Sequence, residues 1–245
     1  KDIQKRGSES LLKNGVQTRK MEPWRLTNLK RLENLLTLPI FTEQEKVSSL
    51  GSKVSAKAPD NGFRLILEPN LIREESTDLP AGLRRLTEKE LQKSLNESLK
   101  QLSDKEQWPL SLNCAANNEI FGLHVSGQNL QQLELVIPAE NNALIPSRVI
   151  IQIEEDAQLD LLQVVLGSGT SAHSHILEIY MAENSTLNHG FLAIGGGQAS
   201  CLAQVSVFQE AYSNYSLTSI QHGWSMSRFE PKIIQTNGHS KTTLN

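Results

Sequence analysis

The sequence predicts an α+β fold in which a mostly helical N-terminal domain is followed by a β-solenoid. Residues 1–110 contain 20 Lys and Arg and 16 Asp and Glu, whereas residues 111–245 contain 4 and 11. Leucines at helical spacing occur before this change in composition, and short β-branched and aromatic runs follow it. We therefore expect two domains of different architecture, 1–110 and 111–245.

The clearest helix is predicted from Thr87 to Leu102. Thr87 and Glu90 form a capping box, in which each side chain satisfies a free backbone N–H at the start of the helix. Leu86 and Leu91 stand at the two positions of a hydrophobic staple. One apolar stripe is expected, made of Leu91, Leu95, Leu99 and Leu102.

Three other segments of the first part carry weaker signals. A helix is expected over Leu26–Leu36, and its inward-facing residues are Leu29, Leu32, Leu35 and Leu36. Phe63–Leu67 is expected to be a short strand. Lys5–Lys20 is rich in bases that alternate with acids and polar residues, so a solvated face is expected there.

The second part contains one short apolar run after another, separated by Gly, Asn, Ser and Pro. This pattern is typical of successive strands. The expected strands are Leu133–Ile137, Val149–Ile153, Leu159–Val165, Ile176–Tyr180, Phe191–Ile194, Leu202–Phe208, Tyr215–Ile220 and Phe229–Ile234.

A weak internal repeat favours a solenoid over other β folds. The segment Glu155–Leu159 is similar to Glu183–Leu187, which begins 28 residues later, and each precedes a strand. Such a period indicates stacked coils, of which none can bury its apolar face alone. A β-helix fits, and a two-sheet sandwich is the alternative. The chain begins at Lys1 and ends at Asn245 inside an expected strand, so we expect more sequence in the natural protein.

Composition excludes several classes of protein. The net charge of −3 argues against a generic nucleic-acid binder, and no apolar run approaches the ~18 residues of a membrane span. Two cysteines, Cys114 and Cys201, are too few for a disulfide framework or a four-cysteine zinc site. Both are expected to be small buried apolar residues.

His173 and His175 are the most interesting candidate for a metal site. They alternate on an expected strand, so both imidazoles lie on one face, and His189 and Cys201 are candidates to join them from neighbouring coils. Because local spacing fixes no third ligand, we favour the alternative of two polar surface residues after a loop.

Two other clusters also have both a functional and a purely structural interpretation. The acidic residues Glu154, Glu155, Asp156 and Asp160 are candidates for glycosidase-type acid–base chemistry, but a solvated corner of the solenoid is the favoured interpretation. Gly195–Gly197 is expected to form a tight corner rather than a phosphate cradle, since no helix follows it.

Met21–Leu29 contains Glu-Pro-Trp-Arg-Leu-Thr. This segment is similar to a signature near the start of SufD-type proteins, a branch of the SufB/SufD family of iron–sulfur cluster assembly components. Arg228–Leu244 is similar to a conserved run in the family's β-helix, and Gln209–Tyr215 and Ser219–Gly223 match the stretch before it. A departure is Ile66–Asn70, which replaces a turn common in the family.

The resemblance implies a non-catalytic scaffold. It implies a right-handed parallel β-helix that pairs with a SufB-like subunit, and a C-terminal helical domain, absent here, that binds a SufC-like ABC-type ATPase. A homodimer in isolation is a further expectation. No catalytic, cofactor-binding or metal-binding residue is carried over. A transient iron–sulfur cluster in the assembled complex is the only cofactor implied, with no nucleic acid and no membrane as partner. The implied compartment is the cytoplasm, or the plastid stroma.

Two other functions compete with this one. A β-helix enzyme acting on polysaccharide would need basic groups for an acidic substrate, but residues 111–245 contain only four basic residues. A structural solenoid of the adhesin type is disfavoured by the charged helical first part.

Overall fold

A computed structural model describes residues 2–41, 62–68, 71–74, 79–100, 108–117, 119–128, 130–139 and 142–245. The helical elements are α1 (Asp2–Asn14), the 3-10 turn η1 (Glu22–Trp24), α2 (Leu29–Leu35), α3 (Glu88–Lys100) and α4 (Trp108–Ala116). The strands are β1 (Gly62–Glu68), β2 (Leu71–Glu74), β3 (Leu83–Arg85), β4 (Phe121–Val125), β5 (Gln132–Ile137), β6 (Leu144–Ile153), β7 (Gln158–Leu166), β8 (Ala172–Met181), β9 (Thr186–Ile194), β10 (Ser200–Gln209), β11 (Asn214–His222), β12 (Met226–Gln235) and β13 (Lys241–Leu244).

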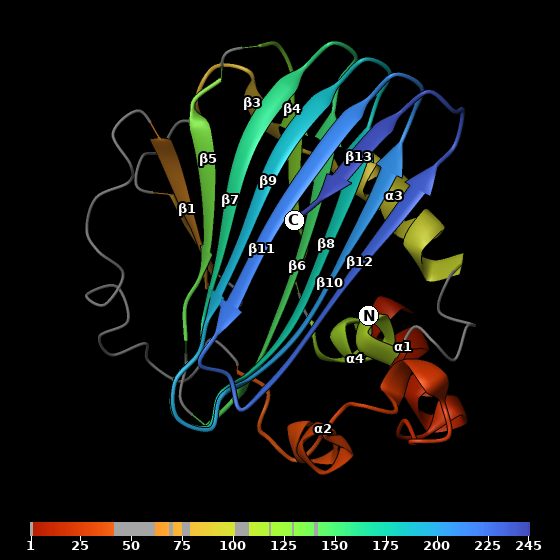
Figure 1. Cartoon of the computed structure of the whole chain (residues 1–245), viewed down its shortest axis with the longest axis vertical. Helices are drawn as coiled ribbons and strands as arrows, with labels where there is room; N and C mark the ends of the chain where they lie inside the picture. Colours follow the sequence, from red (N-terminus) through yellow and green to blue (C-terminus); the bar gives the residue numbers. More distant parts are fainter. Residues whose placement is uncertain are drawn as a thin grey trace.

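From β4 onward the chain winds as a solenoid, and each coil adds one strand to each of two sheets (Figure 1). In the described part of the chain, one sheet has the order β13-β11-β9-β7-β5-β1-β2 and the other β12-β10-β8-β6-β4-β3. All strand pairs between coils are parallel, which confirms a β-solenoid and not a two-sheet sandwich. Right-handed winding stays a prediction.

The register of the sheets confirms the 28-residue repeat. Leu159 pairs with Leu187, at the equivalent position of the next coil. Asp156 and Asn184 occupy the corners before these leucines, and both adopt a positive φ of 58° and 57°. Asp and Asn tolerate this left-handed conformation better than most residues, which explains why those types recur at the corner.

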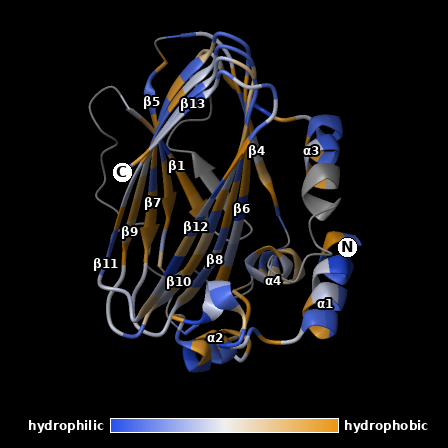
Figure 2. Ribbon diagram, turned by 45° about the vertical axis from the view of Figure 1, so that its right-hand side comes forward, coloured by the Kyte–Doolittle hydropathy of each residue, from blue (hydrophilic) through white to orange (hydrophobic). Residues whose placement is uncertain are grey.

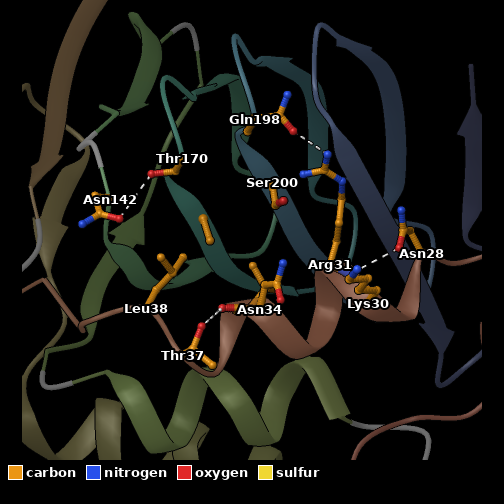
Figure 3. A pocket seen from close by; sticks show the side chains of 12 residues that line it. Asn28, Lys30, Arg31, Asn34, Thr37, Leu38, Asn142, Thr170, Gln198 and Ser200 are labelled. Atoms are coloured by element: carbon orange, nitrogen blue, oxygen red, sulfur yellow. Dashed lines mark hydrogen bonds between the residues drawn. The ribbon is translucent and has the colours of Figure 1, made fainter.

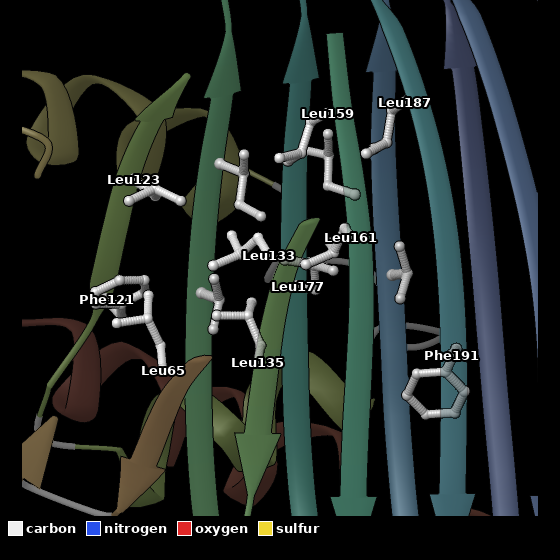
Figure 4. Packing of buried hydrophobic residues seen from close by; sticks show 14 of the residues in the cluster. Leu65, Phe121, Leu123, Leu133, Leu135, Leu159, Leu161, Leu177, Leu187 and Phe191 are labelled. Atoms are coloured by element: carbon white, nitrogen blue, oxygen red, sulfur yellow. The ribbon is translucent and has the colours of Figure 1, made fainter. Parts of the chain in front are cut away.

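The core lies between the two sheets, where alternate residues of every coil point inward (Figure 4). Leu133, Leu159, Leu161 and Leu187 are at most 2% exposed, and Leu177 faces them from the opposite sheet. Each such leucine contributes roughly 1.5–3 kcal/mol through removal of its apolar surface from water. The stacked coils therefore share one continuous core.

The helices cover the sheet that contains β4, β6, β8, β10 and β12 (Figure 2). Helix α4 contacts β6, β8 and β10, and α1 packs against α4. Gly7 permits this close helix crossing, because a Cβ at that position would come within 2.8 Å of the Cys114 side chain. Both faces of β8 are consequently buried.

The predicted elements of the second part are confirmed, since each of the eight expected strands lies within an observed strand. In the first part, Phe63–Leu67 is confirmed within β1. Strands β1 and β3 extend the two sheets of the solenoid, and α4 runs across position 110. The domain boundary at 110 itself stays a prediction.

The predicted helix from Thr87 is confirmed as α3. The backbone N–H of Thr87 donates to Glu90 Oε2 at 2.7 Å, and the Glu90 N–H donates to Thr87 Oγ1 at 3.3 Å, which completes the capping box. Leu86 and Leu91 both pack over Gly122 of β4. The side chain of Leu99 and the whole of Leu102 lie outside the described residues.

Helix α2 is shorter than the expected Leu26–Leu36, and one of its inward assignments is wrong. Leu32 and Leu35 are buried, whereas Leu36 is 45% exposed and Leu26 is 93% exposed. The helix packs through a narrow stripe, so Leu36, one residue beyond Leu35, turns away from the protein.

Candidate functional site

The two sequence signatures meet in space. The guanidinium of Arg228, on β12, lies 4.0 Å from the centre of the Trp24 ring in η1. Arg228 Nη1 also donates to the Pro23 carbonyl at 2.6 Å and to Thr27 Oγ1 at 3.1 Å, and its Nε pairs with Glu230. We call this contact the Trp24–Arg228 junction. It fixes the first signature to the last long strand of the solenoid.

The expected surface position of His173 and His175 is wrong. Both side chains point into the solenoid and are 0% exposed, because odd-numbered residues of β8 face the core. The prediction that they share one face of a strand is confirmed. His189 and Cys201 also face this interior from β9 and β10, at 2% and 0% exposure.

A chain of buried hydrogen bonds crosses the interior between the two sheets. Ser147 Oγ and His175 Nδ1 are 2.7 Å apart, and His175 Nε2 contacts Gln163 Nε2. Gln163 Oε1 lies 3.2 Å from His189 Nε2, and His189 Nδ1 lies 3.0 Å from the Tyr215 hydroxyl. We call these five residues the interior polar chain. Their mutual contacts satisfy polar groups that would otherwise be buried at a cost.

Burial sets the protonation state of these groups. Desolvation lowers the pKa of His175 and of His189 to about 3, and that of His173 to about 4. All three imidazoles are therefore neutral at pH 7. His173 packs edge-on against Trp224, with ring centres 5.8 Å apart, and interacts with the Leu166 backbone.

The cysteines are buried, as expected. Desolvation raises the pKa of Cys201 to about 12, so this thiol stays protonated and unreactive. Within the described residues, no three His, Cys, Asp or Glu side chains are placed to share a metal ion. The expectation that the chain holds no metal-binding, catalytic or cofactor-binding residue stays a prediction.

The acidic cluster lies at a solvated corner, as expected. Glu154, Glu155 and Asp156 are exposed in the turn between β6 and β7. Asp160 is exposed on the outer face of β7, where it accepts a hydrogen bond from Asn188. The tight corner at Gly195–Gly197 is also confirmed, and Gly197 has a φ of 67°.

Sequence reasoning missed a buried ion pair under α4. Arg148 Nη2 and Glu178 Oε1 are 2.9 Å apart on the outer faces of neighbouring strands, at 2% and 3% residue exposure. Arg148 Nη1 also lies 3.0 Å from Cys114 Sγ in α4. Asn113 of α4 donates to the Ser147 and Ser174 carbonyls, at 3.0 and 2.7 Å. These polar contacts fix α4 to the solenoid.

A cleft of about 610 Å³ opens between α2 and three successive corners of the solenoid (Figure 3). We call it the α2 cleft. Nine polar residues line it, among them Lys30, Arg31 and Asn34 on α2 and Asn142, Thr170 and Gln198 on the corners. Arg31 Nη2 donates to Gln198 Oε1 at 2.5 Å. The 28-residue spacing of the three corner residues is the sequence signal that would have found this row.

Part of the solenoid is similar to a known protein family. Residues 135–245 match the model of a family described as the SufBD core domain of SUF system FeS cluster assembly. The match includes Arg228 of the Trp24–Arg228 junction but not Trp24.

Protein ABCI7, chloroplastic, of Arabidopsis thaliana is 22% identical over 269 residues, which cover 99% of this chain and 54% of the relative. The family-model match, which covers less than half of the chain, supports a relationship to the SufB/SufD family. The chain spans about half the length of this curated relative. In the described part of the chain, no helix is both long and apolar enough to cross a membrane.

Proposed function

We propose that this chain is a SufD-type, non-catalytic scaffold of SUF iron–sulfur cluster assembly. The SufBD core match over residues 135–245 carries the proposal. Two features of the fold support it: the match falls on a parallel β-solenoid, and the solenoid is preceded by a helical region held to it at the Trp24–Arg228 junction. We propose right-handed winding of the solenoid on the same basis.

The partners in this proposal are a SufB-like subunit and a SufC-like ABC-type ATPase. The solenoid pairs with the SufB-like subunit, and a C-terminal region outside these 245 residues binds the ATPase. An iron–sulfur cluster is cargo of the assembled complex rather than a resident cofactor. The chloroplastic relative supports the plastid stroma as the compartment, with the cytoplasm as the other candidate.

The polysaccharide-cleaving alternative is not favoured. Its candidate carboxylates lie at an exposed corner and on the exposed outer face of β7, where Asp160 accepts a hydrogen bond from Asn188 at 2.8 Å. The inward face of the same coils is filled by apolar side chains and by the interior polar chain, neither of which includes a carboxyl group. A glycosidase would need two carboxyl groups that flank a bound sugar.

An anaerobic native pull-down of the full-length gene product tests the proposal, with partners identified by mass spectrometry. We expect a SufB-like subunit and an ABC-type ATPase. The 245-residue chain is run beside it, and we expect it to lose the ATPase. Recovery of a SufD-like subunit instead would assign the chain to the SufB side, and recovery of neither partner would refute the assembly role.

A further inference from the structure

The α2 cleft has the volume of a small-molecule site. Its volume of about 610 Å³ lies within the roughly 300–1,000 Å³ typical of ligand pockets. One wall is helix α2, and the other is formed by the corners that precede β6, β8 and β10 (Figure 3). The cleft therefore lies where the N-terminal region meets the solenoid.

The charged side chains that line the α2 cleft are all positive. Lys30 and Arg31 line it, and none of the described residues in its lining is acidic. The solenoid part of the chain is otherwise acidic, with 11 Asp and Glu against 4 Lys and Arg in residues 111–245. Two cations in a concave site concentrate positive potential there and attract an anion.

The solenoid adds a row of neutral hydrogen-bonding groups. Asn142, Thr170 and Gln198 occupy the same corner of three successive coils, and Thr170 donates to Asn142 Oδ1 at 3.4 Å. Since neighbouring parallel strands lie about 4.8 Å apart, the row is about 10 Å long. Amide and hydroxyl donors at this spacing suit an extended ligand with several acceptor oxygens.

Arg31 is already held in position at one end of this row. Its guanidinium donates to Gln198 Oε1 at 2.5 Å, and Gln198 Oε1 also accepts from Ser225 Oγ at 3.5 Å. A guanidinium carries five N–H donors in a planar fork that matches phosphate oxygens. One of these donors binds Gln198, so the fork retains capacity for a ligand.

We propose that the α2 cleft binds a phosphate-bearing small molecule, whose charge is met by Lys30 and Arg31. The corner residues hydrogen-bond its remaining oxygens. A ligand with two or more phosphoryl groups fits the length of the row better than a single phosphate. This inference does not depend on the proposed role in cluster assembly.

Isothermal titration of the 245-residue chain with inorganic pyrophosphate tests this proposal, with orthophosphate and citrate as comparison anions. We expect saturable binding of one pyrophosphate per chain, tighter than that of orthophosphate or citrate. Arg31→Gln and Lys30→Gln should each weaken binding about tenfold, as expected for loss of a charge-assisted contact. Both positions are on the surface of a short helix, so their thermal unfolding midpoints should stay close to that of the wild type.

The matched control is Lys13→Gln, which removes one exposed positive charge from α1, outside the cleft. It should bind pyrophosphate as the wild type does. Equal losses in Lys13→Gln and Arg31→Gln would mean attraction by net charge alone and would overturn the site. Absence of saturable binding, or citrate binding as tightly as pyrophosphate, would overturn it as well.

Discussion

Replacing one partner of the buried ion pair between Arg148 and Glu178 should lower the free energy of unfolding strongly. Replacing both partners together should lower it much less. Both residues are nearly inaccessible, and Arg148 Nη2 lies 2.9 Å from Glu178 Oε1. Replacing one partner leaves the other charge buried without compensation, which typically costs about 3–5 kcal/mol. We expect Arg148→Met to lower the free energy of unfolding by that amount, and Glu178→Met to do the same.

The double variant distinguishes this mechanism from simple loss of packing. Replacement of a whole buried pair by apolar residues is often neutral or stabilising. Arg148→Met/Glu178→Met should therefore be more stable than either single variant, with a coupling energy of about 3 kcal/mol or more. The thiol of Cys114, which accepts from Arg148, is neutral and needs no compensation because burial raises its pKa.

Urea unfolding at pH 7, followed by circular dichroism, measures these differences. Arg84→Met is the control, since it removes an exposed ion pair with Glu90, and its midpoint should stay close to that of the wild type. A double variant as unstable as the sum of the two singles would refute the reasoning. If a single variant fails to fold, a folded double variant still supports it.

Two further predictions concern the corners and the interior. Gly195→Ala should destabilise the protein by about 1–3 kcal/mol in urea unfolding, because the new Cβ would lie 2.6 Å from the Trp224 ring. Gly196→Ala is the control, since its Cβ would meet no atom closer than 3.7 Å. Equal losses of stability in the two variants would contradict the steric explanation. Stability should also fall from pH 7 to pH 5. The lowered pKa of His175 and His189 means that the unfolded chain binds more protons in this window, so each imidazole costs about 2 kcal/mol at pH 5. His189→Gln should make the dependence of the urea midpoint on pH shallower, and an unchanged slope would show that this imidazole does not titrate on unfolding.

The strands could be predicted because each coil must present apolar residues to a shared interior. Strand β4 (Phe121–Val125) of the solenoid was not predicted, because Gly122 interrupts its apolar run. The structure explains the glycine, since a Cβ there would lie 2.5 Å from the Leu91 side chain and 2.8 Å from that of Leu86. That requirement comes from α3, which is distant in sequence.

Helix α4 was missed for a different reason. All but one of its residues, Ala115, are buried, so it has no polar face and no amphipathic period. The histidines were misplaced because a polar residue after a Gly-Ser loop ordinarily faces water. Their burial depends on partners such as Gln163 and Tyr215, which come from other coils and cannot be identified from local spacing.

The Trp24–Arg228 junction also constrains the order of events during synthesis. Arg228 and Pro23 are 205 residues apart, so the ribosome must add that much chain before they can meet. At roughly 5–20 residues per second, the N-terminal segment waits about 10–40 s for its place on the solenoid. Throughout that interval the large indole of Trp24 lacks the cation that later covers it. The junction can therefore form only after the last long strand of the solenoid has been synthesised.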